Sequence, residues 1–117
     1  PSAKERYAQV VQKVAATLVF LFSASNLEKD RYLVSQCAPD GTVPFDVLLT
    51  FPSIGMYTCV VGNPYQLLVD AASSAREFLC FCNWGISNRA WRDEYRRRCA
   101  DFCMHQQSLM QQHGFLV

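Results

Sequence analysis

The residues that could bind a metal ion or act in catalysis lie mostly in the last third of the chain. They are four cysteines and two histidines: Cys80, Cys82, Cys99, Cys103, His105 and His113. Zinc sites use Cys and His, but their cysteine pairs are usually separated by roughly two to four residues. Cys80 and Cys82 are separated by a single residue, and on a strand both would point to the same face. We therefore expect no metal site.

Catalytic motifs are also missing from the sequence. It contains no nucleophile elbow with a Ser/His/Asp order, no glycine-rich phosphate loop and no HExxH pattern. Both histidines fall in or just beyond the last predicted helix. We expect a domain that is not an enzyme and that has no cofactor.

The six cysteines of this 117-residue chain could form disulfides in a secreted protein. Most of them, however, stand in apolar or regular segments, where free cysteine is commonly buried. The longest apolar run, residues 14–22, is too short to cross a bilayer, and the N-terminus lacks a signal-peptide pattern. We expect reduced cysteines and an intracellular protein, cytoplasmic or nuclear, with no membrane partner.

The charge of the chain gives little sign of a nucleic-acid partner, because the net charge is only +1 and nucleic-acid-binding domains usually have a basic excess. Contacts with phosphate would have to come from a local cluster. The one dense cluster is Arg96, Arg97 and Arg98, preceded by Arg89 and Arg92. These arginines are candidate phosphate contacts, and the alternative is a solvated helix face.

The first clear element is a helix with one apolar stripe. Its apolar residues recur three and four positions apart: Tyr7, Val10, Val11, Val14, Leu18, Leu21 and Phe22. Phe20 lies roughly 120° from the centre of this stripe, on the side of Gln9 and Lys13. Core packing does not explain an aromatic residue on the polar side of a helix.

The rest of the pattern predicts four more helices and one strand. The first two helices cover residues 27–37 and 45–51, and Pro52 ends the second. A helix from Asn63, a strand over 77–83 and a helix from 88 to about 113, stopped by Gly114, follow in that order. Ser87 or Asn88 would cap the last helix, whose apolar stripe is Trp91, Tyr95, Cys99, Phe102, Leu109 and Met110. The expected core contains Val10, Val14, Leu18, Phe22, Leu33, Leu48, Leu68 and Val69.

This order of elements favours a helix-rich α+β domain such as a winged helix. A chain of this length forms one domain, and nothing in it repeats or divides it. It opens on Pro1 rather than Met, so we expect residues 1–117 to be a piece of a larger protein.

One stretch carries a specific spacing of aromatic, amide and acidic residues. It comprises Phe20-Leu21-Phe22, Asn26-Leu27, Asp30 and Tyr32-Leu33, and continues through Asp40-Gly41, Val43-Pro44, Leu48-Leu49 and Phe51. This set of residues resembles the signature of the La motif, an RNA-binding domain of the La-related proteins. The resemblance is clear over residues 20–51 and extends more loosely over residues 5–91.

The resemblance implies a winged helix with inserted helices, whose core spans about residues 5–91, followed by a C-terminal helical extension over about 88–113. In La-related proteins an RNA-recognition domain usually follows. In La itself a pocket between the first helices and the inserted ones holds the terminal uridines of an RNA 3′ end. Aromatic faces there stack on bases, and a carboxylate accepts hydrogen bonds from the terminal ribose.

Part of that pocket is retained here. Asp30 and Phe51 match the family, Tyr32 is a like-for-like aromatic, and Phe20 keeps a stacking face without the hydroxyl of the usual Tyr. Each has a plainer interpretation: Asp30 could cap a helix or pair with Arg31, and the aromatics other than Phe20 could be core residues.

Other parts of the pocket are lost. Leu21 stands where the family has a second Tyr, and Thr17 stands where it has a Gln that reads a base edge. Ala24 replaces a residue that is commonly polar. Because buried polar contacts carry much of the discrimination between similar ligands, we expect strict uridine choice to be lost.

We therefore expect a monomeric RNA-binding module for single-stranded RNA, including a 3′ end, with relaxed recognition and a role in RNA stability, processing or translation. The alternative is a La-fold protein-interaction domain of a ribonucleoprotein that has given up RNA, with Leu21 and Ala24 serving a protein ligand or a neighbouring RNA-recognition domain. A winged-helix DNA binder is a third, weaker interpretation.

Overall fold

The computed structural model describes residues 2–112, and for residues 102, 110 and 112 it describes the backbone alone. Its first element is the helix α1, Ala3–Leu21, and the part of the molecule that α1 forms with the elements up to residue 88 is called the body below. Ser2 caps α1 by accepting a hydrogen bond from the Glu5 backbone N–H. The predicted stripe is confirmed: its buried residues include Val11, Val14, Leu18 and Leu21. Tyr7 and Val10 are partly buried and pack against the same core.

Two short helices follow, where the sequence predicts a single helix over residues 27–37. That prediction is wrong, because α2 covers Ala24–Leu27 and α3 covers Arg31–Ser35. Ser23 caps α2, and Asp30 caps α3 by accepting from the Leu33 backbone N–H at 3.0 Å. Two N-caps so close together divide the segment into two separate turns of helix.

The next segment contains β1, Val43–Pro44, then α4, Phe45–Leu48, and α5, Pro52–Gly55. The helix predicted over residues 45–51 is shorter in the structure, because α4 ends at Leu48, four positions before Pro52. Pro52 also starts α5 as its first residue, where a missing N–H costs nothing. A 3₁₀ turn, η1, follows over Thr58–Val60.

Helix α6, Pro64–Ser74, packs along α1 and forms the second long wall of the core. Asn63 caps it, with its side chain accepting from the backbone N–H groups of Tyr65 and Gln66. The prediction of a helix opening at Asn63-Pro64 is confirmed.

A small antiparallel sheet closes the fold, with strand order β1-β3-β2. Strand β2 covers Leu79–Phe81, inside the predicted strand 77–83, and β3 covers Gly85–Asn88. The sequence predicts a single strand in this region, and β3 was not predicted. A side chain at Gly85 would put its Cβ 2.3 Å from the Val43 carbonyl oxygen, so the glycine permits the β1–β3 contact.

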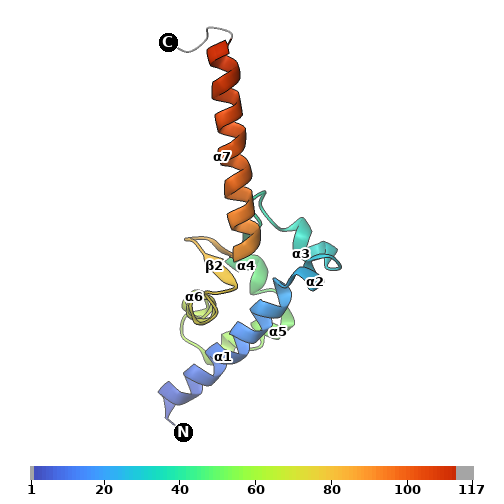
Figure 1. The fold of residues 1–117 in the computed structure, drawn as a ribbon. Coiled ribbons are helices and arrows are strands. Elements are labelled where there is room, and N and C mark those ends of the chain that lie inside the picture. The colour runs from blue at the N-terminus through green and yellow to red at the C-terminus, as the bar shows by residue number, and fades with distance from the viewer. Residues whose placement is uncertain (1, 113–117) are drawn as a thin grey trace.

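The last helix, α7, Arg89–Gln112, leaves the sheet and extends away from the body (Figure 1). Asn88 caps it, as predicted, by accepting from the Trp91 backbone N–H at 2.9 Å. Its 24 residues span roughly 36 Å at 1.5 Å per residue, which accounts for much of the 68 Å length of the molecule. The predicted stop at Gly114 and the side chains of Phe102 and Met110 lie outside the described residues.

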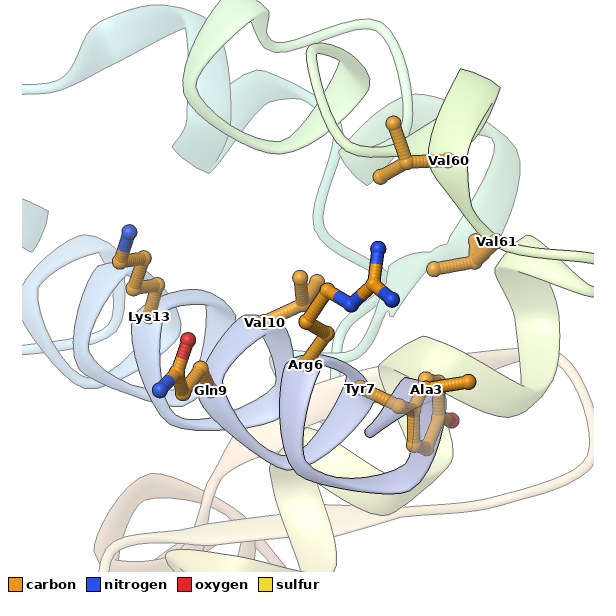
Figure 2. Close-up of a pocket in the computed structure, with 8 residues that line it drawn as sticks. All are labelled: Ala3, Arg6, Tyr7, Gln9, Val10, Lys13, Val60 and Val61. Atoms are coloured by element: carbon orange, nitrogen blue, oxygen red, sulfur yellow. The ribbon is translucent and has the colours of Figure 1, made fainter. Parts of the chain in front are cut away.

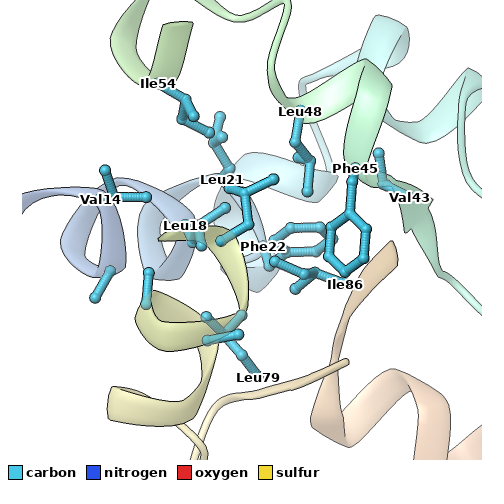
Figure 3. Packing of buried hydrophobic residues seen from close by; sticks show 14 of the residues in the cluster. Val14, Leu18, Leu21, Phe22, Val43, Phe45, Leu48, Ile54, Leu79 and Ile86 are labelled. Atoms are coloured by element: carbon cyan, nitrogen blue, oxygen red, sulfur yellow. The ribbon is translucent and has the colours of Figure 1, made fainter. Parts of the chain in front are cut away.

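The core lies where α1, α6 and the sheet meet (Figure 3). Six of the eight predicted core residues are buried, namely Val14, Leu18, Phe22, Leu33, Leu48 and Leu68. Val10 and Val69 are partly buried against them. The chain is therefore a helix-rich α+β domain with one small antiparallel sheet. No helix in residues 2–112 has the length and apolar character needed to span a bilayer.

Candidate functional site

Tyr32 and Phe51 form an aromatic pair between α3 and the start of α5. Their ring centroids are 5.9 Å apart and their planes lie at 68°, which is an edge-to-face arrangement. Tyr32 is 53% exposed, whereas Phe51 is half-buried and packs against the core. The pair therefore holds the Tyr32 ring in place while leaving much of it open to a ligand.

The carboxylate of Asp30 lies two residues before Tyr32 and has partners of its own. One oxygen caps α3 at the Leu33 N–H, and the other accepts from the Asn26 side-chain amide at 3.4 Å. That amide also donates to the Leu21 carbonyl at 2.8 Å, so it ties the end of α1 to α3. Asp30 therefore caps a helix, which is the plainer interpretation that the sequence offered for it. A carboxylate offers about four acceptor positions, so these two bonds leave room for a ligand hydroxyl.

The three candidate residues on α1 have three different environments. Phe20 is 62% exposed, as its position on the polar side of the helix predicts. Leu21 is 7% exposed and lies in the core, which removes it from contact with any ligand at the surface. The Thr17 hydroxyl donates to the Lys13 carbonyl one turn earlier at 3.1 Å, a bond that competes with contacts to a ligand.

A cavity of about 440 Å³ lies between α1 and η1 (Figure 2). Its floor and one side come from α1, through Arg6, Gln9, Val10 and Lys13, and its other side comes from Val60 and Val61. No residue lining it is acidic. Sequence reasoning placed Gln9 and Lys13 on the polar side of α1 with Phe20, but the valines of η1 were not anticipated.

The environment of Tyr7, at the edge of this cavity, is set by α6. The Tyr7 hydroxyl donates to the Asp70 carboxylate at 2.5 Å. Burial, the hydrogen bond and the negative charge of Asp70 together raise the pKa of Tyr7 to about 12. The phenol therefore stays neutral under ordinary conditions and links α1 to α6.

Two of the three predicted phosphate-binding arginines of α7 pair with a carboxylate of the same helix. Arg97 and Arg98 both pair with Glu94 and are highly exposed. Arg92 lies 3.6 Å from Asp40 and donates to the Thr42 hydroxyl. Arg96 is exposed.

Arg89, the remaining member of the basic cluster, binds the backbone. It donates to the carbonyls of Arg76 at 2.6 Å and Leu79 at 3.2 Å. The density of arginines in the sequence thus reflects partly how α7 is anchored to the body.

A second, aromatic cleft lies beside the β2–β3 hairpin. It has a volume of about 380 Å³ and is lined by Phe45, Asp46, Tyr65, Asn83 and Trp84. The Tyr65 hydroxyl donates to Asp46 at 2.5 Å, and the Tyr65 ring meets Phe45 edge to face. Trp84 and Tyr65 are both exposed, so this cleft presents two aromatic faces to solvent.

The cysteines considered for metal binding do not gather in the part of the chain that the structure describes. Within residues 2–112, no three Cys, His, Asp or Glu side chains come together in a group that could hold a metal ion. The Cys80 thiol lies 2.9 Å from the Ser87 hydroxyl, across the β2–β3 pair. Burial raises the pKa of the Cys37 thiol, which donates to the Leu33 carbonyl. His113 lies outside the described residues.

No protein-family model matches this chain, and no curated protein matches it.

Proposed function

We propose that this domain binds single-stranded RNA through the exposed aromatic residues at the junction of α1, α3 and α5. The proposed architecture is a winged helix of the La-motif kind, in which the β2–β3 hairpin is the wing and α7 is a C-terminal extension. In this proposal the domain acts inside the cell, in RNA stability, processing or translation.

The observation that carries the proposal is the exposure of Tyr32 and Phe20. An aromatic side chain buried in a core needs no ligand to explain it, but these two rings are more than half exposed. Tyr32 is also braced by Phe51, and Asp30 stands two residues away from it. Unpaired bases stack on such faces, and each stacked base contributes on the order of 1–3 kcal/mol.

The same contacts favour relaxed recognition of the base. Selective sites contain polar groups that pair with base edges, and rejection follows when those groups are left unpaired. Here the Thr17 hydroxyl already has a partner, and Leu21 is in the core. Stacking accepts every base, so we expect weak binding with little preference for uridine.

A titration of fluorescently labelled RNAs tests this proposal. Oligo-U, oligo-A and mixed sequences, each with a free or a blocked 3′ end, should bind with similar affinity. Tyr32→Ala and Phe20→Ala should each weaken binding by about 5- to 150-fold, the equivalent of one lost stacked base. Phe81→Ala is a matched control, because Phe81 is an exposed aromatic residue on β2 rather than on α1, α3 or α5.

Two results would contradict the proposal. Absence of binding to every RNA, even at low salt, would exclude RNA as the ligand. Tight uridine-specific binding that needs a free 3′ hydroxyl would contradict the relaxed recognition while keeping RNA as the ligand.

A second candidate function is protein interaction, and the aromatic cleft beside the hairpin favours it. Aromatic residues are enriched at protein interfaces, and Trp84 and Tyr65 present theirs at the surface. In this case Trp84→Ala should release a co-purifying protein that Tyr32→Ala retains. The opposite pattern, with loss on Tyr32→Ala alone, would exclude the cleft as the interface.

A further inference from the structure

The α1 cavity combines two features, in a domain whose net charge is only +1. It has two cationic side chains, Arg6 and Lys13, and an apolar wall made by Val10, Val60 and Val61. Neither cation takes part in an ion pair within residues 2–112. Figure 2 shows Arg6, Gln9 and Lys13 projecting from the same side of α1, with the two valines of the η1 segment across from them.

The chemistry of this cavity suits a nucleotide better than a wholly apolar ligand. Two unpaired cations attract phosphate groups. The valine wall can contact the flat face of a base, while the Gln9 amide can donate to and accept from base edges. A volume of about 440 Å³ lies within the usual range of small-ligand sites.

The cavity also continues the aromatic surface that carries the proposed function. In an α-helix, residues seven positions apart fall within about 20° of one face and lie roughly 10 Å apart along the axis. Arg6, Lys13 and Phe20 have this spacing. They therefore form one line along α1, roughly 21 Å long, which corresponds to on the order of six stacked nucleotides at ~3.4 Å each.

We propose that the α1 cavity is a second subsite for the RNA strand bound at Phe20 and Tyr32. Lys13 and then Arg6 neutralise phosphates of the nucleotides that lie beyond Phe20 along α1, and one base enters between Val10 and the valines of the η1 segment. This inference rests on the proposed function and adds to it a direction and a length: the strand follows α1 toward its N-terminus.

The dependence of affinity on RNA length tests the second subsite. Oligo-A of two to twelve nucleotides is titrated against the wild-type chain and against Arg6→Ala/Lys13→Ala. Wild-type affinity should rise with length up to about six nucleotides and then level off, as the line along α1 fills. The double variant should bind dinucleotides normally, bind the longer RNAs about tenfold more weakly, and have a salt slope smaller by roughly 1.4, or 0.7 per lost phosphate contact.

A charge-matched control separates this site from general attraction. Lys4→Ala/Arg76→Ala removes the same two charges, but Lys4 lies on the far side of α1 from Arg6 and Arg76 lies beyond α6. Equal losses of RNA affinity in the two double variants would overturn the proposal, because any surface cation would then contribute as much to RNA binding as Arg6 and Lys13.

The path of the phosphates past the valines has its own test at Val60, which is 66% exposed and so tolerates substitution without loss of the fold. Val60→Glu should weaken binding of the long RNAs alone, whereas Val60→Lys should preserve or strengthen it. Equal effects of the two variants would overturn the placement of the strand in this cavity.

The failures of the two proposals are distinguishable. If short RNAs bind in a Tyr32-dependent manner but affinity does not increase with length, the second subsite is wrong and the proposed function stands. If no RNA binds to the wild-type chain, both are wrong. Binding of an acidic peptide that Arg6→Ala/Lys13→Ala abolishes, without any effect of these substitutions on RNA, would also overturn the second subsite.

Discussion

Helices α1 and α7 are the two longest in the protein, and both carry basic residues, but the basic residues have different surroundings. On α1, Arg6 and Lys13 border a cavity and take part in no ion pair within the described residues. On α7, Arg97 and Arg98 share Glu94, and Arg89 and Arg92 bind the body of the protein. Within the described residues, two of the three consecutive arginines of α7 have an acidic partner, whereas neither Arg6 nor Lys13 on α1 has one.

The difference arises from how each helix is packed. α1 is buried along one face for most of its length, so its other face has a defined orientation relative to the rest of the molecule. α7 contacts the sheet near its start and then extends away from it (Figure 1). A site needs side chains held in fixed relation to one another, and of these two helices α1 provides a packed scaffold over several turns.

The largest effect that should separate the two helices is on stability. Leu18 on α1 is fully buried, and Leu18→Ala should lower the free energy of unfolding by about 2–5 kcal/mol, through lost burial and the cavity left behind. Met104 on α7 is 68% exposed, and Met104→Ala should change it by less than about 0.5 kcal/mol. Urea unfolding followed by circular dichroism measures both. Similar losses at the two positions would mean that the outer part of α7 packs on the body.

The junction of α7 with the body is the next most sensitive point. Gly41 has a φ of +83°, and a Cβ there would lie 3.0 Å from the Trp91 ring. Gly41→Ala should therefore destabilise the protein by about 1–3 kcal/mol, through strain and displacement of Trp91. Gly62→Ala is the matched control, because a Cβ there meets nothing within 4 Å. Equal stabilities of the two variants would show that the Gly41–Trp91 contact does not hold α7 in place.

Much of the fold could be predicted from the sequence, because periodicity is strong where a helix has one buried face. The stripe of α1, the capped start of α6 at Asn63 and the cap of α7 at Asn88 follow from local residues alone. The two short helices around Asp30 could not be predicted in the same way. A helix of one or two turns has too few residues to show a period, and its bounds depend on the caps of Ser23 and Asp30.

The candidate site was predictable where it depends on one helix and not where it depends on two distant segments. The exposure of Phe20 follows from its angle on α1, and the structure agrees. The burial of Leu21 follows from the same angle, although the resemblance to the La motif drew attention to it as a site position. The valine wall of the α1 cavity comes from residues about fifty positions away, and no local pattern connects Val60 to Arg6.

A smaller effect concerns the link between α1 and α6 at high pH. The pKa of Tyr7 is raised from its ordinary value of 10 to about 12 in the folded chain, so the neutral phenol is favoured on folding. Its contribution to stability is therefore complete below pH 10 and is lost as the pH rises from 10 to about 12. Tyr7→Phe should remove this pH dependence and cost about 1 kcal/mol at neutral pH. Tyr65→Phe, which loses an exposed hydroxyl–carboxylate bond, should change the pH profile less. An unchanged profile in Tyr7→Phe would show that another group titrates in this range.

The smallest expected effect is that of the α7 arginines on RNA binding. Arg97→Gln/Arg98→Gln should weaken binding of a long RNA by no more than about twofold, because both arginines are already paired with Glu94 and are screened by solvent. The same titrations that test Arg6→Ala/Lys13→Ala measure this, at two salt concentrations.

Glu94→Gln makes that comparison sharper, because it removes the acidic partner of Arg97 and Arg98 without removing either arginine. If the RNA does not reach α7, the freed arginines should change affinity only through the weak, salt-screened attraction of one extra positive charge. If the strand does lie against α7, releasing two arginines beside its phosphates should strengthen binding several-fold and steepen the salt dependence by roughly 0.7 for each new contact. A steeper salt dependence in Glu94→Gln, together with a large loss of affinity in Arg97→Gln/Arg98→Gln, would show that the phosphate contacts lie on α7 and not on α1. A flat response in both variants, beside a length-dependent loss in Arg6→Ala/Lys13→Ala, would mean that the packing of a helix, rather than the density of its basic residues, decides where the RNA binds.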